Sequence, residues 1–114
     1  GKFSSTIIGS GTKIDNLVQI GHNCKIGQNC AISGTAAIAG SVEIGNWVQI
    51  AGNVGIVPHV TIGDGAKIGA KSGVLSDIPA GESWVGFPAV PLKKGLRQWA
   101  AVRKLPKIIA QLKK

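Results

Sequence analysis

The chain has 114 residues, enough for one domain, and its 13 Lys and Arg residues against 5 Asp and Glu residues give a formal net charge of +8. No apolar run approaches the roughly 20 residues that a membrane span needs, and two cysteines are too few for a disulfide scaffold. The hydrophobic content of 44% excludes a disordered chain, and the scarcity of aromatic residues disfavours a nucleic-acid-binding module.

The charge is concentrated at the C-terminal end. Residues 1–92 contain five lysines and all five acidic residues, so this part is neutral overall. Residues 93–114 contain eight basic residues and no acidic one. A neutral body therefore carries a strongly basic tail.

An internal repeat of six residues predicts the fold of the body. Isoleucine recurs every sixth residue from Ile8 to Ile68, and Val74 takes the next place in the series. A small or β-branched residue stands four places after each Ile, and Gly, Asn and Asp, which tolerate a left-handed backbone, are frequent between them. A helix cannot keep a period of six on one face. We therefore predict an all-β fold over residues 1–81, a parallel β-helix with three hexads per turn and rungs about 4.8 Å apart.

The pattern changes beyond the repeats. Residues 82–92 contain Pro88 and Pro91 and are predicted to form an irregular connector. From residue 93 to 114 the apolar residues follow helical spacing. Because proline interrupts a helix, Pro106 is predicted to divide this tail into two basic helices.

Stacking every eighteenth residue places both histidines on one edge of the prism. His22 stacks below Gly40, and Gly40 stacks below Pro58, which precedes His59. A shared edge could arise by accident in so small a chain. In the neighbouring outward column the side chains are small over three successive rungs: after Gln19 it contains Ala37, Gly55 and Gly73. This column predicts either close contact between subunits or a groove for a long, thin ligand, and both hold if the site lies between subunits.

These residue types suit acyl transfer. Histidine accepts a proton near neutral pH, as the attack of an amine or hydroxyl requires. A glycine N–H that no side chain covers, such as that of Gly40, can stabilise a developing oxyanion. No Ser or Cys is evidently paired with His22, which favours direct transfer over a covalent intermediate. Cys24 and Cys30 occupy core places without metal-ligand spacing, so we predict buried thiols and no metal site.

Several strings together resemble one enzyme family: residues 14–23 (IDNLVQIGHN), 38–41 (IAGS), 86–89 (GFPA) and 96–100 (LRQWA). They are similar to the acyltransferase domain of the UDP-3-O-acylglucosamine N-acyltransferases of lipid A synthesis. The resemblance implies a left-handed β-helix and a cytoplasmic bacterial homotrimer with active sites between subunits. It also implies transfer of a 3-hydroxyacyl chain from acyl carrier protein, as its phosphopantetheine thioester, to the 2-amine of a nucleotide sugar. No other cofactor is implied.

The resemblance also assigns roles to residues. His22 matches the general base, Gly40 the oxyanion donor, and His59 a second histidine near the substrate. Asp15 matches a carboxylate that orients His22, although a solvated corner acid fits equally well. We further expect Asn23, Ala37, Gly55 and Gly73 to contact the substrate. In this chain Val57 and Pro58 precede His59, where the family has Ala-Gly.

The resemblance covers the acyltransferase part of the family. The chain opens within a repeat at Gly1, and the family's N-terminal uridine-binding domain precedes this part. We therefore expect the chain to correspond to a fragment or a reduced form without that domain.

The basic tail and the fold each allow other functions. The tail is expected to dock the acidic carrier protein through Arg97, Arg103, Lys104 and Lys107. A solvated helix face, or peripheral contact with a membrane or nucleic acid, is the alternative. The fold also suits an acetyl-CoA-dependent hexapeptide acetyltransferase or a non-catalytic scaffold. With two histidines the chain is short of the three that a γ-type carbonic anhydrase needs.

Overall fold

The structure is a computed structural model that describes residues 5–113. Residues 1–4 of the predicted β-helix and Lys114 of the predicted tail lie outside the described residues. Twelve two-residue strands follow one another at intervals of six residues. They are β1 (Ile7–Ile8), β2 (Lys13–Ile14), β3 (Gln19–Ile20), β4 (Lys25–Ile26), β5 (Ala31–Ile32), β6 (Ala37–Ile38), β7 (Glu43–Ile44), β8 (Gln49–Ile50), β9 (Gly55–Ile56), β10 (Thr61–Ile62), β11 (Lys67–Ile68) and β12 (Gly73–Val74).

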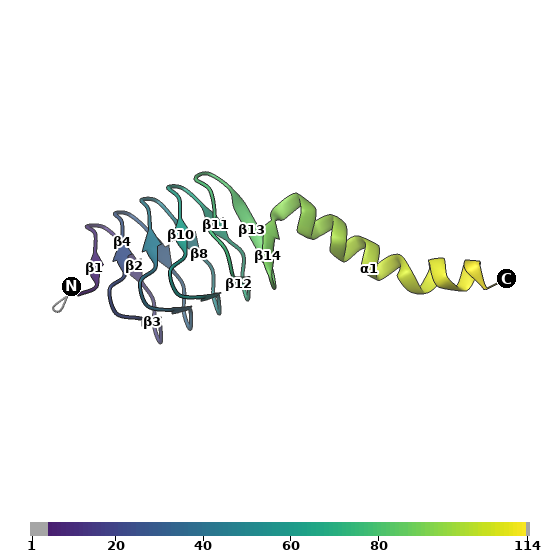
Figure 1. Cartoon of the computed structure of the whole chain (residues 1–114), viewed down its shortest axis with the longest axis horizontal. Helices are drawn as coiled ribbons and strands as arrows, with labels where there is room; N and C mark the ends of the chain where they lie inside the picture. The colour runs from purple at the N-terminus through teal and green to yellow at the C-terminus, as the bar shows by residue number, and fades with distance from the viewer. Residues whose placement is uncertain (1–4, 114) are drawn as a thin grey trace.

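The strands stack into three parallel sheets, which confirms the predicted β-helix (Figure 1). Their orders are β1-β4-β7-β10, β2-β5-β8-β11 and β3-β6-β9-β12, so each strand pairs with the one three hexads later. The register is 18 residues throughout, as in the pairing of Ile26 with Ile44. Left-handed corners recur between strands, with φ near +60° at non-glycine residues such as Asn29 and Trp47.

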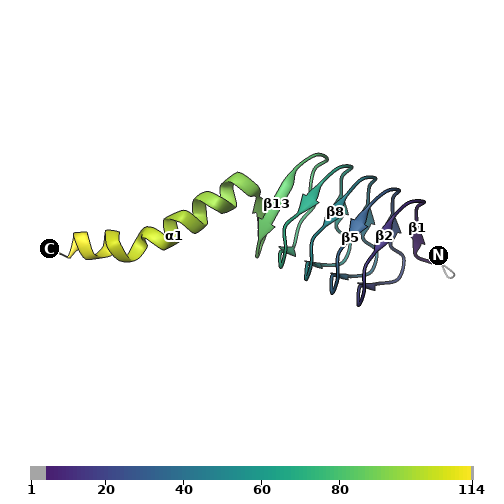
Figure 2. The same ribbon diagram turned by 180° about the vertical axis from the view of Figure 1, so that it is seen from behind.

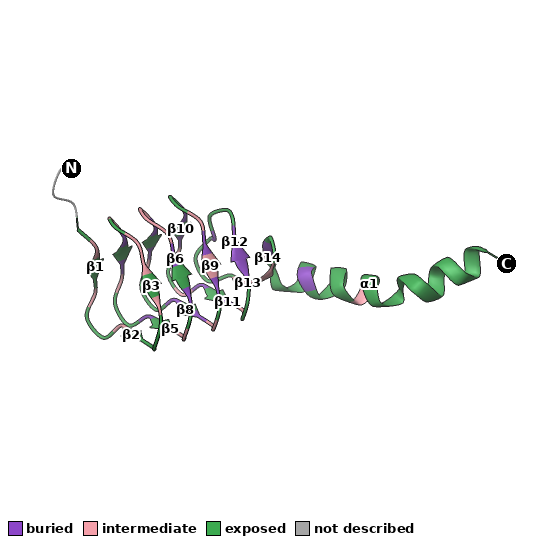
Figure 3. Ribbon diagram, turned by 90° about the horizontal axis from the view of Figure 1, so that it is seen from below, coloured by how far each residue is buried: buried purple, intermediate pink, exposed green. Residues whose placement is uncertain are grey.

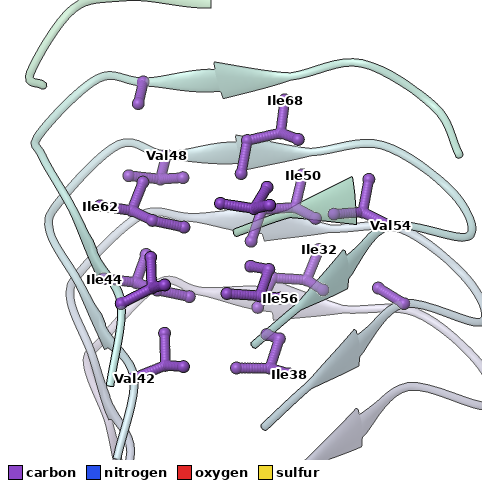
Figure 4. Close-up of a cluster of buried hydrophobic side chains, with 14 of the residues drawn as sticks. Ile32, Ile38, Val42, Ile44, Val48, Ile50, Val54, Ile56, Ile62 and Ile68 are labelled. Carbon is purple, nitrogen blue, oxygen red and sulfur yellow. The ribbon is translucent and has the colours of Figure 1, made fainter. Parts of the chain in front are cut away.

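The repeated isoleucines form the core of the coil (Figure 4). Ile32, Ile50 and Ile68 lie above one another, and none of them is more than 2% exposed. The small places of the hexad fill the space beside them, since Val42 and Val48 are completely buried. Burying each such side chain stabilises the fold by about 1.5–3 kcal/mol, so the core is built from many equal contributions.

The two ends of the coil differ. At the N-terminal end Ile8 and Ile14 are 44% and 37% exposed, so the first described turn leaves its core side chains open. At the other end, Ile78 of the closing turn is buried and pairs with Ile62.

The predicted irregular connector is wrong, because residues 82–92 fold largely as a β-hairpin. β13 (Ser83–Gly86) pairs in parallel with β11, and β14 (Ala89–Pro91) pairs antiparallel with β13 at the edge of that sheet. Pro88 lies in the turn and Pro91 ends the edge strand, two places where proline is tolerated in a sheet. The hairpin covers the end of the core, and its residue Trp84 packs against the core side chains.

The basic tail is a single helix, α1 (Leu92–Leu112), which projects away from the coil (Figures 1 and 2). The predicted division at Pro106 is wrong: proline removes one backbone hydrogen bond, and the bonds on either side continue the helix. Only Gly95 of α1 is buried, so nearly the whole helix is exposed (Figure 3). In the part of the chain that the structure describes, no helix is long and apolar enough to cross a membrane.

We predict that Ile50→Ala lowers the free energy of unfolding by about 2–5 kcal/mol, because the truncation leaves a cavity between two stacked rungs. Its strand neighbour Gln49 is exposed, so Gln49→Ala should change the free energy by less than about 0.5 kcal/mol. Denaturant titration measures both values. Equal losses in the two variants would contradict the alternating burial within each strand.

Candidate functional site

His22, Gly40 and His59 lie at one corner of the coil, where strands of the β3-β6-β9-β12 sheet end. The backbone joins the three rungs, since Ser41 N–H donates to His22 O at 2.9 Å and His59 N–H donates to Gly40 O at 3.3 Å. The His22 imidazole lies over Gly40: a methyl group on Gly40 would lie 3.0 Å from Cε1 and 3.1 Å from Nε2. Glycine therefore leaves the space that the His22 ring occupies.

The Gly40 N–H donates no hydrogen bond within residues 5–113. At the adjacent corner the equivalent N–H groups are capped by a side chain from the next rung: Gln28 N–H donates to Asn46 Oδ1 at 2.8 Å, and Asn46 N–H donates to Asp64 Oδ1 at 2.7 Å. The residue one rung above Gly40 is Pro58, whose side chain carries no acceptor. The proline thus leaves a free backbone donor beside the His22 ring.

Gly21 lies directly below the Gly40 N–H. A side-chain carbon at Gly21 would lie 2.5 Å from the Gly40 nitrogen, and the equivalent glycines of other hexads, such as Gly9 and Gly63, approach the next rung as closely. Glycine in this place is therefore required by the stacking of the coil. An imidazole beside an uncovered N–H is an arrangement that can accept a proton and stabilise an oxyanion at one reacting carbonyl.

Asp15 and Asn23 are placed differently from expectation. Asp15 lies at another corner, where Oδ1 accepts from the Asn16 N–H at 2.7 Å, and it makes no hydrogen bond to His22 among the described residues. An orienting role inside one chain therefore has no contact to support it. Asn23 adopts a φ of 59° beside His22, and its Oδ1 is buried without a partner in the described part of the chain, so this oxygen is not presented to a ligand.

An apolar groove of about 700 Å³ adjoins this corner along the outer face of the β3-β6-β9-β12 sheet. Its lining includes Gly21 and Ala39, the neighbours of His22 and Gly40, and the small column Ala37, Gly55 and Gly73. Gly55 is open, since a methyl group there would meet no atom within 4 Å. Gly73 differs, because it is buried and the ring of Phe87 lies against it. The column is therefore open at its middle and covered at its C-terminal end.

Most basic residues of α1 lie opposite a group of four apolar residues, although exposed Leu96 and Ile108 lie on the basic side. At 100° per residue, Trp99, Val102, Leu105 and Ile109 share one side, and all four are 44–62% exposed. The opposite side carries Lys93, Arg97, Lys104 and Lys107, with Arg103 beside it. One helix thus carries the four basic residues predicted to bind the carrier protein and an apolar face that the rest of the chain leaves exposed.

The two cysteines lie in the core, as predicted, and form no disulfide. Cys24 Sγ lies 3.1 Å from the carbonyl oxygen of Ala39, and Cys30 Sγ lies 3.1 Å from that of Gly45. These weak thiol hydrogen bonds satisfy backbone carbonyls inside the coil.

Sequence reasoning missed three residues of the site: Gly21, Pro58 and Phe87. The first two could have been found by applying the period of 18 to backbone N–H groups, since the Gln28–Asn46–Asp64 column shows what a capped corner contains. Phe87 lies outside the repeats, and no periodicity relates it to Gly73.

Comparisons with known proteins point to one family. Residues 5–40 match the family described as "Bacterial transferase hexapeptide (six repeats)". Over 100 residues, 88% of this chain, the sequence is 57% identical to a UDP-3-O-acylglucosamine N-acyltransferase of Rhizobium meliloti and 48% identical to one of Caulobacter. The matches span 28% and 29% of those proteins, so the chain covers less than a third of their length.

A solved structure shares the fold. A serine acetyltransferase of Neisseria gonorrhoeae superposes with a TM-score of 0.73 at 32% sequence identity, over 76% of this chain and 37% of the other. The predicted resemblance to the UDP-3-O-acylglucosamine N-acyltransferases is confirmed at the level of sequence, and the serine acetyltransferase shares the coil.

We predict that Pro58→Asn slows amide hydrogen exchange at Gly40 several-fold. The new Asn side chain would accept a hydrogen bond from the Gly40 N–H, as Asn46 accepts one from the Gln28 N–H. Such a hydrogen bond contributes about 1 kcal/mol. The reciprocal variant, Asn46→Ala, should speed exchange at Gln28. Gly40 and Gln28 amides that are equally protected in the unaltered protein would contradict the assignment of a free donor.

Proposed function

We propose that the chain is a bacterial hexapeptide-repeat transferase and that it transfers a 3-hydroxyacyl chain from acyl carrier protein to the 2-amine of UDP-3-O-acylglucosamine. The observation that carries the proposal is the His22 ring over Gly40, whose N–H is free, at the edge of an apolar groove. The 48–57% identity to proteins of that name supports the choice of substrates. We propose that the reaction takes place in the bacterial cytoplasm.

In the proposed mechanism, the acceptor amine attacks the thioester carbonyl while His22 takes the proton that the amine loses. The Gly40 N–H donates to the oxyanion of the tetrahedral intermediate. The intermediate then expels the carrier thiolate, which recovers the proton from the His22 imidazolium, and an amide is formed. His59, tied to the Gly40 carbonyl through its N–H, lies one rung away and is proposed to contact the phosphate of the acceptor.

The groove is proposed to hold the acyl chain. Its lining is almost entirely apolar, and Ala37 and Gly55 leave room above the sheet. A hydrocarbon chain laid along this face would be withdrawn from water while its thioester carbonyl remains beside Gly21 and Gly40. The direction of the groove, across successive rungs, suits a long, thin substituent rather than a compact one.

We propose a homotrimer as the active form. The apolar face of α1 (Trp99, Val102, Leu105 and Ile109) is exposed in the single chain, and three such helices around one axis would cover it. The same arrangement would roof the groove with a neighbouring coil. Asp15, which makes no hydrogen bond to His22 within residues 5–113, is proposed to reach a histidine across such an interface.

The basic face of α1 is proposed to dock the carrier protein. An acidic carrier is steered by a surface without competing carboxylates, and α1 contains no acidic residue. Placing the apolar face in the trimer leaves Arg97, Arg103, Lys104 and Lys107 free for this contact.

An acetyl-CoA-dependent acetyltransferase is the second candidate function. It is favoured by the likeness to serine acetyltransferases, one of which was solved in complex with CoA. The open groove beside Gly21 argues against it, since an acetyl group needs no such space. The two candidates are separated by the donor that supports turnover.

We predict that His22→Ala reduces turnover of a 3-hydroxyacyl carrier thioester by about 10²–10⁴-fold, the usual contribution of a general base. His22 is exposed, so the thermal midpoint of unfolding should not change. Gln28 occupies the equivalent corner place one hexad later and is also exposed, so Gln28→Ala is the matched control and should retain full turnover.

The same assay includes acetyl-CoA as the competing donor. Turnover with acetyl-CoA, but with no hydroxyacyl carrier, would replace the proposed donor by the second candidate. Turnover that survives in His22→Ala would remove the histidine from the mechanism. Because the chain spans less than a third of its relatives' length, a longer form of the protein should be assayed beside it.

We predict that the double change Arg103→Glu and Lys104→Glu raises the Michaelis constant for the carrier donor about tenfold at low salt and leaves that for the sugar unchanged. Reversing Lys25 and Lys67, two exposed lysines of the coil, changes the net charge equally and serves as the control. If both double variants raised the Michaelis constant for the carrier equally, net charge alone would explain the effect, and a docking site on α1 would be contradicted.

A further inference from the structure

The Gly40 N–H belongs to the peptide group between Ala39 and Gly40, and the carbonyl of that group accepts a hydrogen bond from a thiol. Cys24 Sγ lies 3.1 Å from the Ala39 oxygen, and Cys24 is completely buried. No backbone N–H of residues 5–113 donates to this carbonyl. The proposed mechanism uses the N–H end of the peptide group, and its carbonyl end is held by a residue of the core.

A hydrogen-bond donor at position 24 is not required by the coil. Valine takes the same inward place in five other hexads and has no hydrogen to donate. Four residues in this place donate to the carbonyl fifteen residues later, two hydroxyls at 2.7 Å and two thiols at 3.1 Å: Thr6, Thr12, Cys24 and Cys30. The place therefore accepts either kind of residue, and the consequence of a donor depends on the peptide group that it reaches.

The bond from Cys24 acts on the N–H of Gly40. A hydrogen bond to an amide oxygen polarises the whole amide and makes its N–H a stronger donor, because hydrogen bonds in a chain reinforce one another. The Gly40 N–H lies beside the His22 ring and donates to no group of residues 5–113. The added donor strength is therefore available to a ligand.

The bond from Cys30 acts on a peptide group that is already satisfied at both ends. Its acceptor is the Gly45 oxygen, and the N–H of the same peptide group, that of Asn46, donates to Asp64 Oδ1 at 2.7 Å. Cys24 and Cys30 thus make equal bonds with different consequences, and each is the matched control for the other.

We propose that Cys24 is a positioning residue for the transfer reaction, whose thiol fixes the Ala39–Gly40 peptide group and strengthens the Gly40 N–H as the oxyanion donor. The inference rests on the proposed function, because it assigns a further residue to that same site. The thiol keeps its proton throughout, and it touches no substrate because it is buried.

The kinetic test is Cys24→Val. One oxyanion donor contributes about 10²–10³-fold to turnover, and one hydrogen bond strengthens the next by roughly 10–30% of its free energy, so turnover should fall about two- to eightfold. Both Michaelis constants should be unchanged, because the donor acts on charge that develops after binding. Cys24→Thr should restore turnover, since the hydroxyls of Thr6 and Thr12 reach a carbonyl from the same place.

The control is Cys30→Val, which loses an equal hydrogen bond at the adjacent corner. The two valine variants should lower the thermal midpoint equally, whereas Cys30→Val should retain full turnover. Equal losses of turnover in the two variants, or full turnover in folded Cys24→Val, would overturn the inference.

Nuclear magnetic resonance separates this inference from the proposed function, because the amide nitrogen shift of Gly40 reports polarisation of its peptide group without any turnover. The resonance should move upfield in Cys24→Val, return in Cys24→Thr and stay in place in Cys30→Val. Normal transfer with a Gly40 resonance that ignores Cys24 would overturn the inference and leave the proposed function intact. A resonance that follows Cys24, in a protein that transfers no acyl chain, would support the strengthened donor and refute the transfer reaction.

Discussion

The 18-residue register between parallel strands is the constraint on which every other feature of this protein depends. It is maintained because each inward isoleucine must lie on the isoleucine of the next rung to be buried, and because a shift by one residue would turn the whole set outward. The backbone hydrogen bonds follow the same register at every corner. Outward residues 18 apart are therefore brought together at a fixed spacing, and the site is assembled from this geometry.

The corners of the coil differ in how their backbone N–H groups are satisfied. At the Gln28–Asn46–Asp64 corner, two N–H groups donate to a side chain from the rung above. At the His22 corner, Pro58 offers no side-chain acceptor to the Gly40 N–H. Other corner N–H groups of the described residues, such as those of Gly34 and Gly52, are also without such a cap, and that of Gly40 differs from them in lying beside a histidine ring.

The hairpin β13–β14 links the two parts of the molecule. It covers the C-terminal end of the core through Trp84, carries Phe87 to the end of the groove, and leads directly into α1. The helix in turn exposes an apolar face that one chain cannot cover, with a basic face opposite. The coil is thus the support, and the hairpin and α1, which lie outside its repeats, are attached at its C-terminal end.

The period of six, and with it the strands, the core and the shared edge of His22, Gly40 and His59, could be predicted from the sequence because each depends on residues at a constant separation. The small column was recognisable for the same reason. The hairpin, the unbroken helix through Pro106, and the contact of Phe87 with Gly73 could not be predicted, because they join segments that no period relates and because proline is tolerated or not according to its neighbours. The sequence alone determined which residues stack on one another. Only the tertiary structure decided which of the stacked residues are accessible to a ligand, because accessibility depends on which other segments of the chain cover them.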